Sequence, residues 1–214
     1  MRVKICGMMR LSDVSAALNE GADAVGFVVE SPSSPRNLPL TKAQKLMKAV
    51  RMFSTKVAVT STHDPKRIIV VCSRLKPDAL QLHYHTPQLV HILRKKQPAI
   101  RLILATEVRD KLTLKQAKST SRYADAVLAD SPSSTGMGGT GITHDWGLTA
   151  RIRKGIYPHP LILAGGLTPN NVKTAIETVR PFAVDVSSGV EKTVGIKDHS
   201  KIREFIMKAK EASA

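Results

Sequence analysis

The chain has 214 residues, and 42% of them are hydrophobic, which is enough for one sizeable core; we therefore expect a single domain over residues 1–214. No stretch approaches the roughly 18 consecutive apolar residues of a membrane helix, and no apolar segment of a signal peptide follows the basic N-terminus. Two cysteines are too few for a disulfide framework, so the composition predicts a soluble cytoplasmic protein without a membrane partner.

The net charge of +16 comes from 33 Lys and Arg against 17 Asp and Glu. Such an excess is typical of nucleic-acid binding, of steering a small anionic substrate into a cleft, or of a solvated basic surface. The basic residues are scattered along the chain, aromatic residues make up only 4%, and neither a zinc finger nor an aromatic RNA-binding motif occurs. These features disfavour a specific nucleic-acid partner.

Short β-branched or apolar runs alternate with amphipathic segments along the whole chain. Strands are predicted at Val3–Cys6, Ala24–Val29, Lys56–Thr60, Ala79–Leu82, Arg101–Ala105, Ala126–Ala129, Leu161–Ala164 and Ala183–Val186. Helices are predicted at Ser12–Glu20, Thr41–Arg51, Pro65–Arg74, Pro87–Lys96, Leu112–Ser119, Trp146–Lys154, Pro169–Val179 and Lys197–Lys210. Eight such units favour an α/β fold, the closed (β/α)8 TIM barrel, with a doubly wound open sheet as the alternative.

Helix ends are predicted from residues with capping chemistry. Ser12, Asp145 and Thr168 are expected to cap the helices that follow them, and Gly21 to lie just after the first helix. In a (β/α)8 barrel the active site lies at the carboxyl ends of the strands, so chemistry is expected directly after each strand.

Two candidate acid–base groups occupy such positions. Cys6 ends the first strand, where a thiolate can act as a base if positive neighbours lower its pKa; the alternative is a small buried cysteine. Asp130 ends the sixth strand, where a carboxyl group with a pKa raised by burial can act as an acid. Its alternative role is to bind nearby backbone amides at the start of a loop.

Glycine-rich loops follow the last two strands, where barrel enzymes frequently bind phosphate through backbone N–H groups. The predicted phosphate-binding residues are Gly165 and Gly166 after the seventh strand, Ser188 and Gly189 after the eighth, and Gly139 and Gly141 after the sixth. Each glycine pair alone is also compatible with a tight turn.

Arg36 and two histidines complete the candidate site. Arg36 follows the second strand in a Ser/Pro-rich loop, where its guanidinium suits carboxylate binding unless it is simply solvated. His83 and His85 follow the fourth strand at a spacing that permits a metal pair. No further histidines or carboxylates follow the neighbouring strands, so we expect no metal.

Segments in one consistent order carry a family resemblance: KICGM, GADAVGFVV with SPR, LQLH, GGTGITHDW, LAGGLTPNNV, DVSSGVE and GIKD. Together they closely resemble phosphoribosylanthranilate isomerase, from residue 2 to about residue 206. That family performs the Amadori rearrangement of N-(5-phosphoribosyl)anthranilate to 1-(2-carboxyphenylamino)-1-deoxyribulose 5-phosphate in tryptophan biosynthesis, without a metal or organic cofactor. The resemblance therefore implies a small phosphorylated substrate, and either a monomer or a homodimer.

The resemblance also implies roles for individual residues. Cys6 matches the general base that removes the proton at ribose C2, and Asp130 the general acid that opens the furanose ring. Arg36 matches the residue that holds the anthranilate carboxylate, and Asp185 and His83 lie in matching motifs near the substrate. The glycines of the last two loops, with Ser188, match the phosphate clamp.

Several positions depart from the family pattern. Met9 stands where KICGIT has Thr, Tyr84 where QLHG has Gly, and His144 where FDW has Phe, so we expect a weaker aromatic packing contact at His144.

The nearest alternative enzyme is the ProFAR isomerase of histidine biosynthesis, which carries Asp where Cys6 stands. The alternative from another class is a basic nucleic-acid-binding protein.

Overall fold

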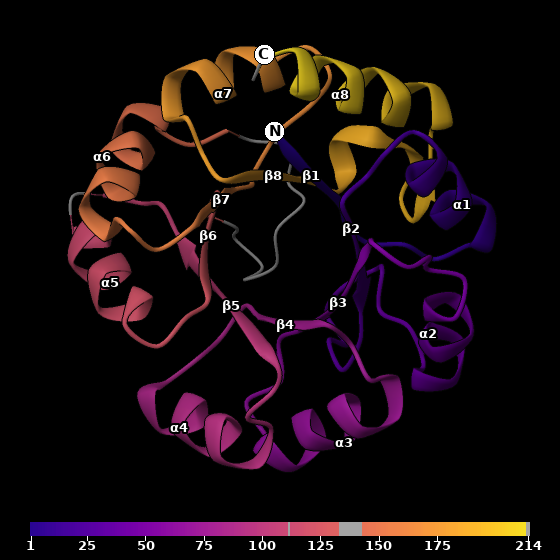
Figure 1. The fold of residues 1–214 in the computed structure, drawn as a ribbon, viewed down its shortest axis with the longest axis vertical. Coiled ribbons are helices and arrows are strands. Elements are labelled where there is room, and N and C mark those ends of the chain that lie inside the picture. Colours follow the sequence, from indigo (N-terminus) through magenta and orange to yellow (C-terminus); the bar gives the residue numbers. More distant parts are fainter. Residues whose placement is uncertain (111, 133–142, 213–214) are drawn as a thin grey trace.

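The computed structural model describes residues 1–110, 112–132 and 143–212. Eight parallel strands close into a barrel in chain order, because β1 pairs with both β2 and β8 (Figure 1). The strands are β1 (Arg2–Ile5), β2 (Ala24–Val28), β3 (Thr55–Thr60), β4 (Ala79–Leu82), β5 (Arg101–Glu107), β6 (Ala126–Asp130), β7 (Leu161–Leu163) and β8 (Ala183–Val186). The predicted (β/α)8 barrel is confirmed, and the open sheet is excluded.

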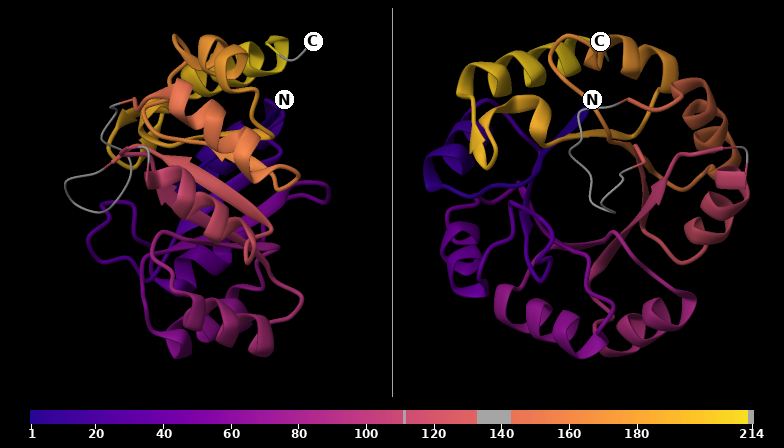
Figure 2. Two further views of the ribbon diagram at one scale, coloured as in Figure 1. Left: turned by 90° about the vertical axis from the view of Figure 1, so that its left-hand side faces the viewer. Right: turned by 180° about the vertical axis from the view of Figure 1, so that it is seen from behind.

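Helices surround the barrel as an outer ring, which Figures 1 and 2 show from both ends. They are α1 (Leu11–Asn19), α2 (Leu40–Met47), α3 (Pro65–Leu75), α4 (Pro87–Lys96), α5 (Leu112–Ser121), α6 (Trp146–Ile156), α7 (Val172–Val179) and α8 (His199–Glu211). Within the described part of the chain, none of these helices is long and apolar enough to cross a membrane.

The helix ends confirm two predictions and correct two others. Asp145 caps α6 by accepting a hydrogen bond from the backbone, and Gly21 adopts the left-handed conformation after α1. The prediction for Ser12 was wrong, because α1 begins one residue earlier and Ser12 lies inside its first turn. Thr168 caps the turn that precedes α7 and not α7 itself: its Oγ1 accepts from the Asn170 N–H at 3.3 Å and its own N–H donates to Asn171 Oδ1 at 2.8 Å, and α7 begins only at Val172.

The connection after β8 departs most from the prediction. A 3-10 turn (Ser188–Val190) is followed by a small hairpin of β9 (Glu191–Thr193) and β10 (Ile196–Lys197). Residue 197, expected to begin the last helix, therefore lies in a strand, and α8 starts after the cap Asp198. This hairpin lies beside the start of α1, where the Lys197 N–H donates to Asp13 Oδ2 at 3.4 Å.

Two sets of buried side chains show which way the strand residues point. The outer set packs between strands and helices, and the inner set fills the barrel. Along β6, Ala126 and Leu128 belong to the inner set and Val127 and Ala129 to the outer one. Because successive strand residues point to opposite faces, Asp130 faces the barrel interior.

The same alternation carries other polar side chains into the barrel. Lys4 shares its face of β1 with Cys6, Gln81 shares its face of β4 with the inward Ala79, and Asp185 does so on β8 with Ala183. All three polar side chains are almost fully buried. A polar layer thus lies above the apolar filling, at the carboxyl ends of the strands.

Candidate active site

A cavity opens at the carboxyl ends of the strands, where a (β/α)8 barrel places its chemistry. Every predicted site residue that the structure describes lines this cavity: Cys6, Arg36, His83, Asp130, Gly165, Gly166, Asp185, Ser188 and Gly189. Gly139 and Gly141 lie outside the described residues. Side chains and loops from most of the strands therefore converge on one space.

Asp130 reaches this cavity from the end of β6 and is only 8% exposed. Burial disfavours its charged form and raises the pKa of Asp130 to about 7, although the Ser131 N–H donates to its Oδ1 at 2.8 Å and opposes the shift. Asp130 thus accepts a local backbone amide and also holds its proton near neutral pH. A carboxyl group with this pKa is suited to donate a proton.

Cys6 reaches the cavity from the end of β1. Burial raises the pKa of the Cys6 thiol, while the neighbouring Lys4 ammonium favours the thiolate. The Lys4 Nζ donates to Asp185 Oδ2 at 2.9 Å, and both side chains of this pair are less than a tenth exposed. The site therefore contains the positive neighbour that a basic cysteine requires.

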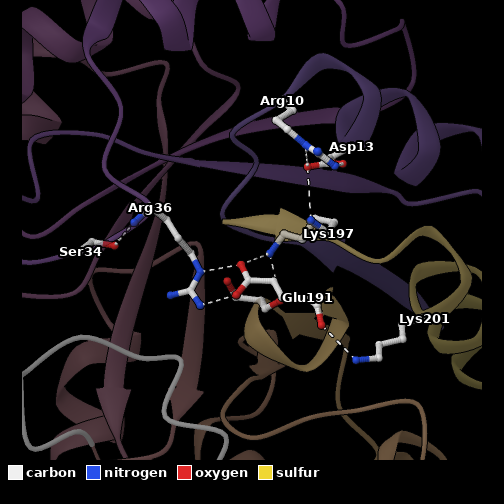
Figure 3. Close-up of polar contacts among 8 residues, drawn as sticks. Arg10, Asp13, Ser34, Arg36, Glu191, Lys197 and Lys201 are labelled. Carbon is white, nitrogen blue, oxygen red and sulfur yellow. Dashed lines mark hydrogen bonds and ion pairs between the residues drawn. The ribbon is translucent and has the colours of Figure 1, made fainter. Parts of the chain in front are cut away.

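Arg36 is buried rather than solvated, and its guanidinium already holds a carboxylate. Its Nε and Nη2 donate to the two oxygens of Glu191 at 2.7 and 2.6 Å (Figure 3). The Lys197 Nζ donates to the same Glu191 at 3.0 Å and to the Ser187 carbonyl at 2.9 Å. Among the described residues Nη1 of Arg36 has no hydrogen-bond partner, so donors of the guanidinium stay available to a ligand.

The loops after β7 and β8 meet at their glycines. Gly165 and Gly166 both adopt the left-handed conformation, which favours glycine. A Cβ on Gly165 would lie 2.4 Å from the backbone nitrogen of Ser131, and one on Gly189 would lie 1.8 Å from the carbonyl oxygen of Leu167. The backbone of these loops thus forms part of the cavity wall, where its polar groups can face an anion.

His83 lines the cavity, but His85 does not join it there. Burial lowers the pKa of both imidazoles. The His83 ring nitrogen lies 3.4 Å from the amide nitrogen of Gln81, while the His85 ring nitrogen bonds the Ala105 carbonyl at 3.1 Å. In the described ranges, no three His, Cys, Asp or Glu side chains lie together as potential metal ligands.

Two departures from the family pattern have local partners. The Tyr84 and His63 rings lie 5.1 Å apart at a tilt of 35°. The His144 ring nitrogen lies 3.0 Å from the Ser131 Oγ, and burial lowers the pKa of His144 to about 4. His144 thus makes a polar contact as a neutral imidazole.

Sequence reasoning assigned no role to four buried residues of this region: Lys4, Gln81, Glu191 and Lys197. Two of them had a usable signal, because Lys4 and Gln81 interrupt apolar strands at positions that share a face with other site residues. Glu191 and Lys197 had none, since their contact with Arg36 depends on the β9–β10 hairpin.

Comparison with known proteins assigns this fold and cavity to a family. The family model described as N-(5'phosphoribosyl)anthranilate (PRA) isomerase matches residues 3–208. The N-(5'-phosphoribosyl)anthranilate isomerases of Methanothrix thermoacetophila and Halorubrum lacusprofundi are 44% and 40% identical to the chain, over 98% and 97% of it and 98% and 96% of their own lengths.

Solved structures agree with the sequence relatives. The phosphoribosyl anthranilate isomerase of Thermotoga maritima superposes with a TM-score of 0.87 at 38% identity, over 99% of each chain. A second structure of such an isomerase, in complex with reduced 1-(o-carboxyphenylamino)-1-deoxyribulose 5-phosphate, gives a TM-score of 0.85 at 36% identity, over 99% of each chain. The chain belongs to the N-(5'-phosphoribosyl)anthranilate isomerase family, isomerases of tryptophan biosynthesis.

Proposed function

We propose that the chain converts N-(5'-phosphoribosyl)anthranilate to 1-(2-carboxyphenylamino)-1-deoxyribulose 5-phosphate, with Asp130 as general acid and Cys6 as general base. The observation that carries this proposal is the placement of both groups, from β6 and β1, in the cavity that the glycine loops also line. A reaction that opens a ring and then enolises the product needs one acid and one base at the substrate.

Asp130 supplies the first proton. It protonates the furanose ring oxygen as the bond from that oxygen to C1 breaks, and the nitrogen lone pair forms the C1–N double bond of a protonated Schiff base. With its pKa raised to about 7, the Asp130 carboxyl group still holds a transferable proton near neutral pH.

Cys6 takes the second proton. Its thiolate removes the proton from C2, and the electron pair of that bond forms the C1–C2 double bond while the electrons of the C1–N double bond return to nitrogen. The resulting enolamine tautomerises to the ketone. No metal or organic cofactor is required for either proton transfer.

Two anchors at the cavity wall hold the substrate between these groups. The loops that contain Gly165, Gly166, Ser188 and Gly189 bind the phosphate. Arg36 uses the donors that Glu191 leaves available to bind the anthranilate carboxylate. Asp185 and His83 line the space between the anchors, where they contact the ribose. Fixing both ends of the substrate supplies the positioning that the chemistry needs.

The test follows the loss of anthranilate-type fluorescence after the protein is added to freshly generated phosphoribosylanthranilate. The wild type should turn over, whereas Cys6→Ala and Asp130→Asn should each lose roughly 100- to 10,000-fold in kcat. Cys72→Ala is the matched control, because Cys72 is buried in the outer core on α3, away from the cavity. Near-normal turnover by either site variant would remove that residue from its proposed role.

A further inference from the structure

Lys4 is a buried lysine between two other functional side chains. It is 3% exposed, its Nζ donates to Asp185 Oδ2 at 2.9 Å, and Cys6 lies two residues further along on the same face of the strand. The second Asp185 oxygen, Oδ1, is buried without a hydrogen-bond partner among the described residues. Asp185 therefore holds the ammonium through one oxygen, which leaves Lys4 N–H groups for the sulfur.

Gly26 on β2 leaves room for the Cys6 and Lys4 side chains, because it has no side chain of its own. The register of β1 and β2 places Gly26 next to Cys6. A Cβ on Gly26 would lie 2.8 Å from the Cys6 sulfur and 3.2 Å from the Lys4 Nζ. The sulfur and the ammonium thus occupy the space that the missing side chain leaves, and both are held against the same point of the barrel wall.

Four charged groups act on the Cys6 sulfur. Three are cations, Lys4, Lys197 and Arg36, and one is an anion, Asp185. Arg36 and Lys197 both donate to Glu191, whose carboxylate offsets their charge. Among the residues that the structure describes, Lys4 is the cation that favours the thiolate most, and its Nζ shares the space beside Gly26 with the sulfur.

We propose that Lys4 is the positioning residue that makes Cys6 a base, by stabilising its thiolate through the charge of the adjacent ammonium while Asp185 anchors that ammonium. The inference rests on the proposed function of Cys6. Lys4 acts through Cys6 and not on the substrate, so it controls how much thiolate is present before the proton at C2 is removed.

Electrostatics supports this assignment. Burial raises the pKa of the Cys6 thiol, and a neutral thiol cannot accept a proton. An opposite charge within about 4 to 6 Å shifts a pKa by about 1 to 3 units, enough to restore a useful thiolate fraction. Asp185 opposes this effect on the sulfur, but it also keeps the Lys4 ammonium charged at a buried position.

The experiment measures the ionisation of Cys6 itself, in free protein. The chain has two cysteines, so Cys72→Ala leaves Cys6 as the sole thiol. The rate of alkylation by iodoacetamide is recorded against pH in this parent, and ultraviolet thiolate absorbance gives a second reading that needs no reagent access. The variants are Lys4→Met, Lys4→Arg, Lys197→Met and the double variant Lys4→Met/Asp185→Asn, which leaves no unpaired buried charge if the single variant fails to fold.

Lys4→Met should raise the midpoint of thiol ionisation by about one pH unit or more, and Lys4→Arg should restore most of the shift. The double variant should raise the midpoint less than Lys4→Met, because Asp185→Asn also removes an anion that disfavours the thiolate. Lys197→Met should shift the midpoint less than Lys4→Met, since the charge of Lys197 is offset by Glu191. A midpoint that stays at the parent value in both Lys4→Met and the double variant would overturn the inference, as would a larger shift in Lys197→Met.

Failure of the proposed function gives a different result. If Cys6 is the base, the acidic limb of kcat/KM in Lys4→Met moves with the alkylation midpoint. If the alkylation midpoint moves, the acidic limb of kcat/KM keeps its pH and Cys6→Ala remains active, then Lys4 sets the ionisation of the Cys6 thiol but Cys6 is not the base. If the midpoint does not move in Lys4→Met and Cys6→Ala is inactive, Cys6 is the base and Lys4 does not have the proposed positioning role.

Discussion

Replacing Asp130 with Asn should make the protein more stable above neutral pH while it abolishes turnover. Burial raises the pKa of Asp130 to about 7, well above the ordinary value of 3.8. In the unfolded chain this carboxyl group ionises as the pH rises past its ordinary pKa, whereas in the folded protein it keeps its proton until about 7. The unfolded state therefore binds fewer protons across this window, and the stability of the wild type falls as the pH rises through it.

The size of the effect follows from the shift. A rise of about 3 pKa units corresponds to about 4 kcal/mol at roughly 1.4 kcal/mol per unit, and the loss is complete above the folded pKa. The amide introduced by Asp130→Asn cannot ionise, so the variant should escape this loss. That amide can still accept the hydrogen bond from the Ser131 N–H, and any fixed cost of burying it does not depend on pH.

Urea unfolding of the two proteins at pH values of about 4, 6 and 8 measures the difference directly. Groups that titrate alike in both proteins cancel, so the stability of the variant relative to the wild type should grow by about 2 to 4 kcal/mol between the first and last pH. A difference that stays constant with pH would show that Asp130 ionises at its ordinary pKa. In that case it would be a poor proton donor at neutral pH, and its assignment as the acid would lose its physical basis.

Other substitutions test other parts of the site. Glu191→Gln should raise KM roughly 10- to 100-fold with a smaller fall in kcat, because it breaks the charged pair that holds Arg36; an unchanged KM would contradict this role. Asp13→Asn should cost about 1 to 3 kcal/mol in urea unfolding near neutral pH. Burial disfavours the Asp13 carboxylate, but hydrogen bonds from the partly exposed Arg10 and His199 side chains outweigh burial and lower the pKa of Asp13. The stability that Asp13 contributes is therefore present above the unfolded pKa and is lost as the pH falls through the folded pKa; equal costs of the substitution at low and neutral pH would refute this. Gly189→Ala would place a Cβ 1.8 Å from the Leu167 carbonyl oxygen, so binding of inorganic phosphate measured by calorimetry should weaken at least tenfold, and unchanged binding would exclude Gly189 from the phosphate site.

The barrel could be predicted from the sequence because its signals are local. Apolar strands and amphipathic helices alternate in eight units, and the strands are near-continuous apolar runs because both of their faces are covered. Once the barrel is assumed, the positions of Cys6 and Asp130 at strand ends follow, as do the glycine loops after β7 and β8. Helix ends were less predictable, since the Thr168 and Asn171 side chains together close a turn before α7, and the helix begins later than expected.

The partners of the site residues could not be predicted in the same way. Arg36 and Glu191 are 155 positions apart, and they meet because the closed barrel brings the loop after β2 close to the segment that follows β8. The sequence around Lys197 has helix-like periodicity, so its place in β10 was missed. Long-range pairing of charges depends on the closed barrel, which no local pattern encodes.

For the buried Lys4–Asp185 pair we predict that a substitution that preserves or increases stability lowers activity. Desolvating the Lys4–Asp185 pair costs free energy that its attraction only partly recovers, so replacing both with apolar residues should leave stability unchanged or raise it by about 1 to 4 kcal/mol. We therefore expect Lys4→Met/Asp185→Val to unfold at equal or higher urea concentration than the wild type while kcat falls sharply. Each single variant should be destabilised by about 3 to 5 kcal/mol, because it leaves one buried charge unpaired. A double variant as unstable as the single ones would mean that this pair holds the barrel together, and its position at the cavity would then reflect folding and not catalysis.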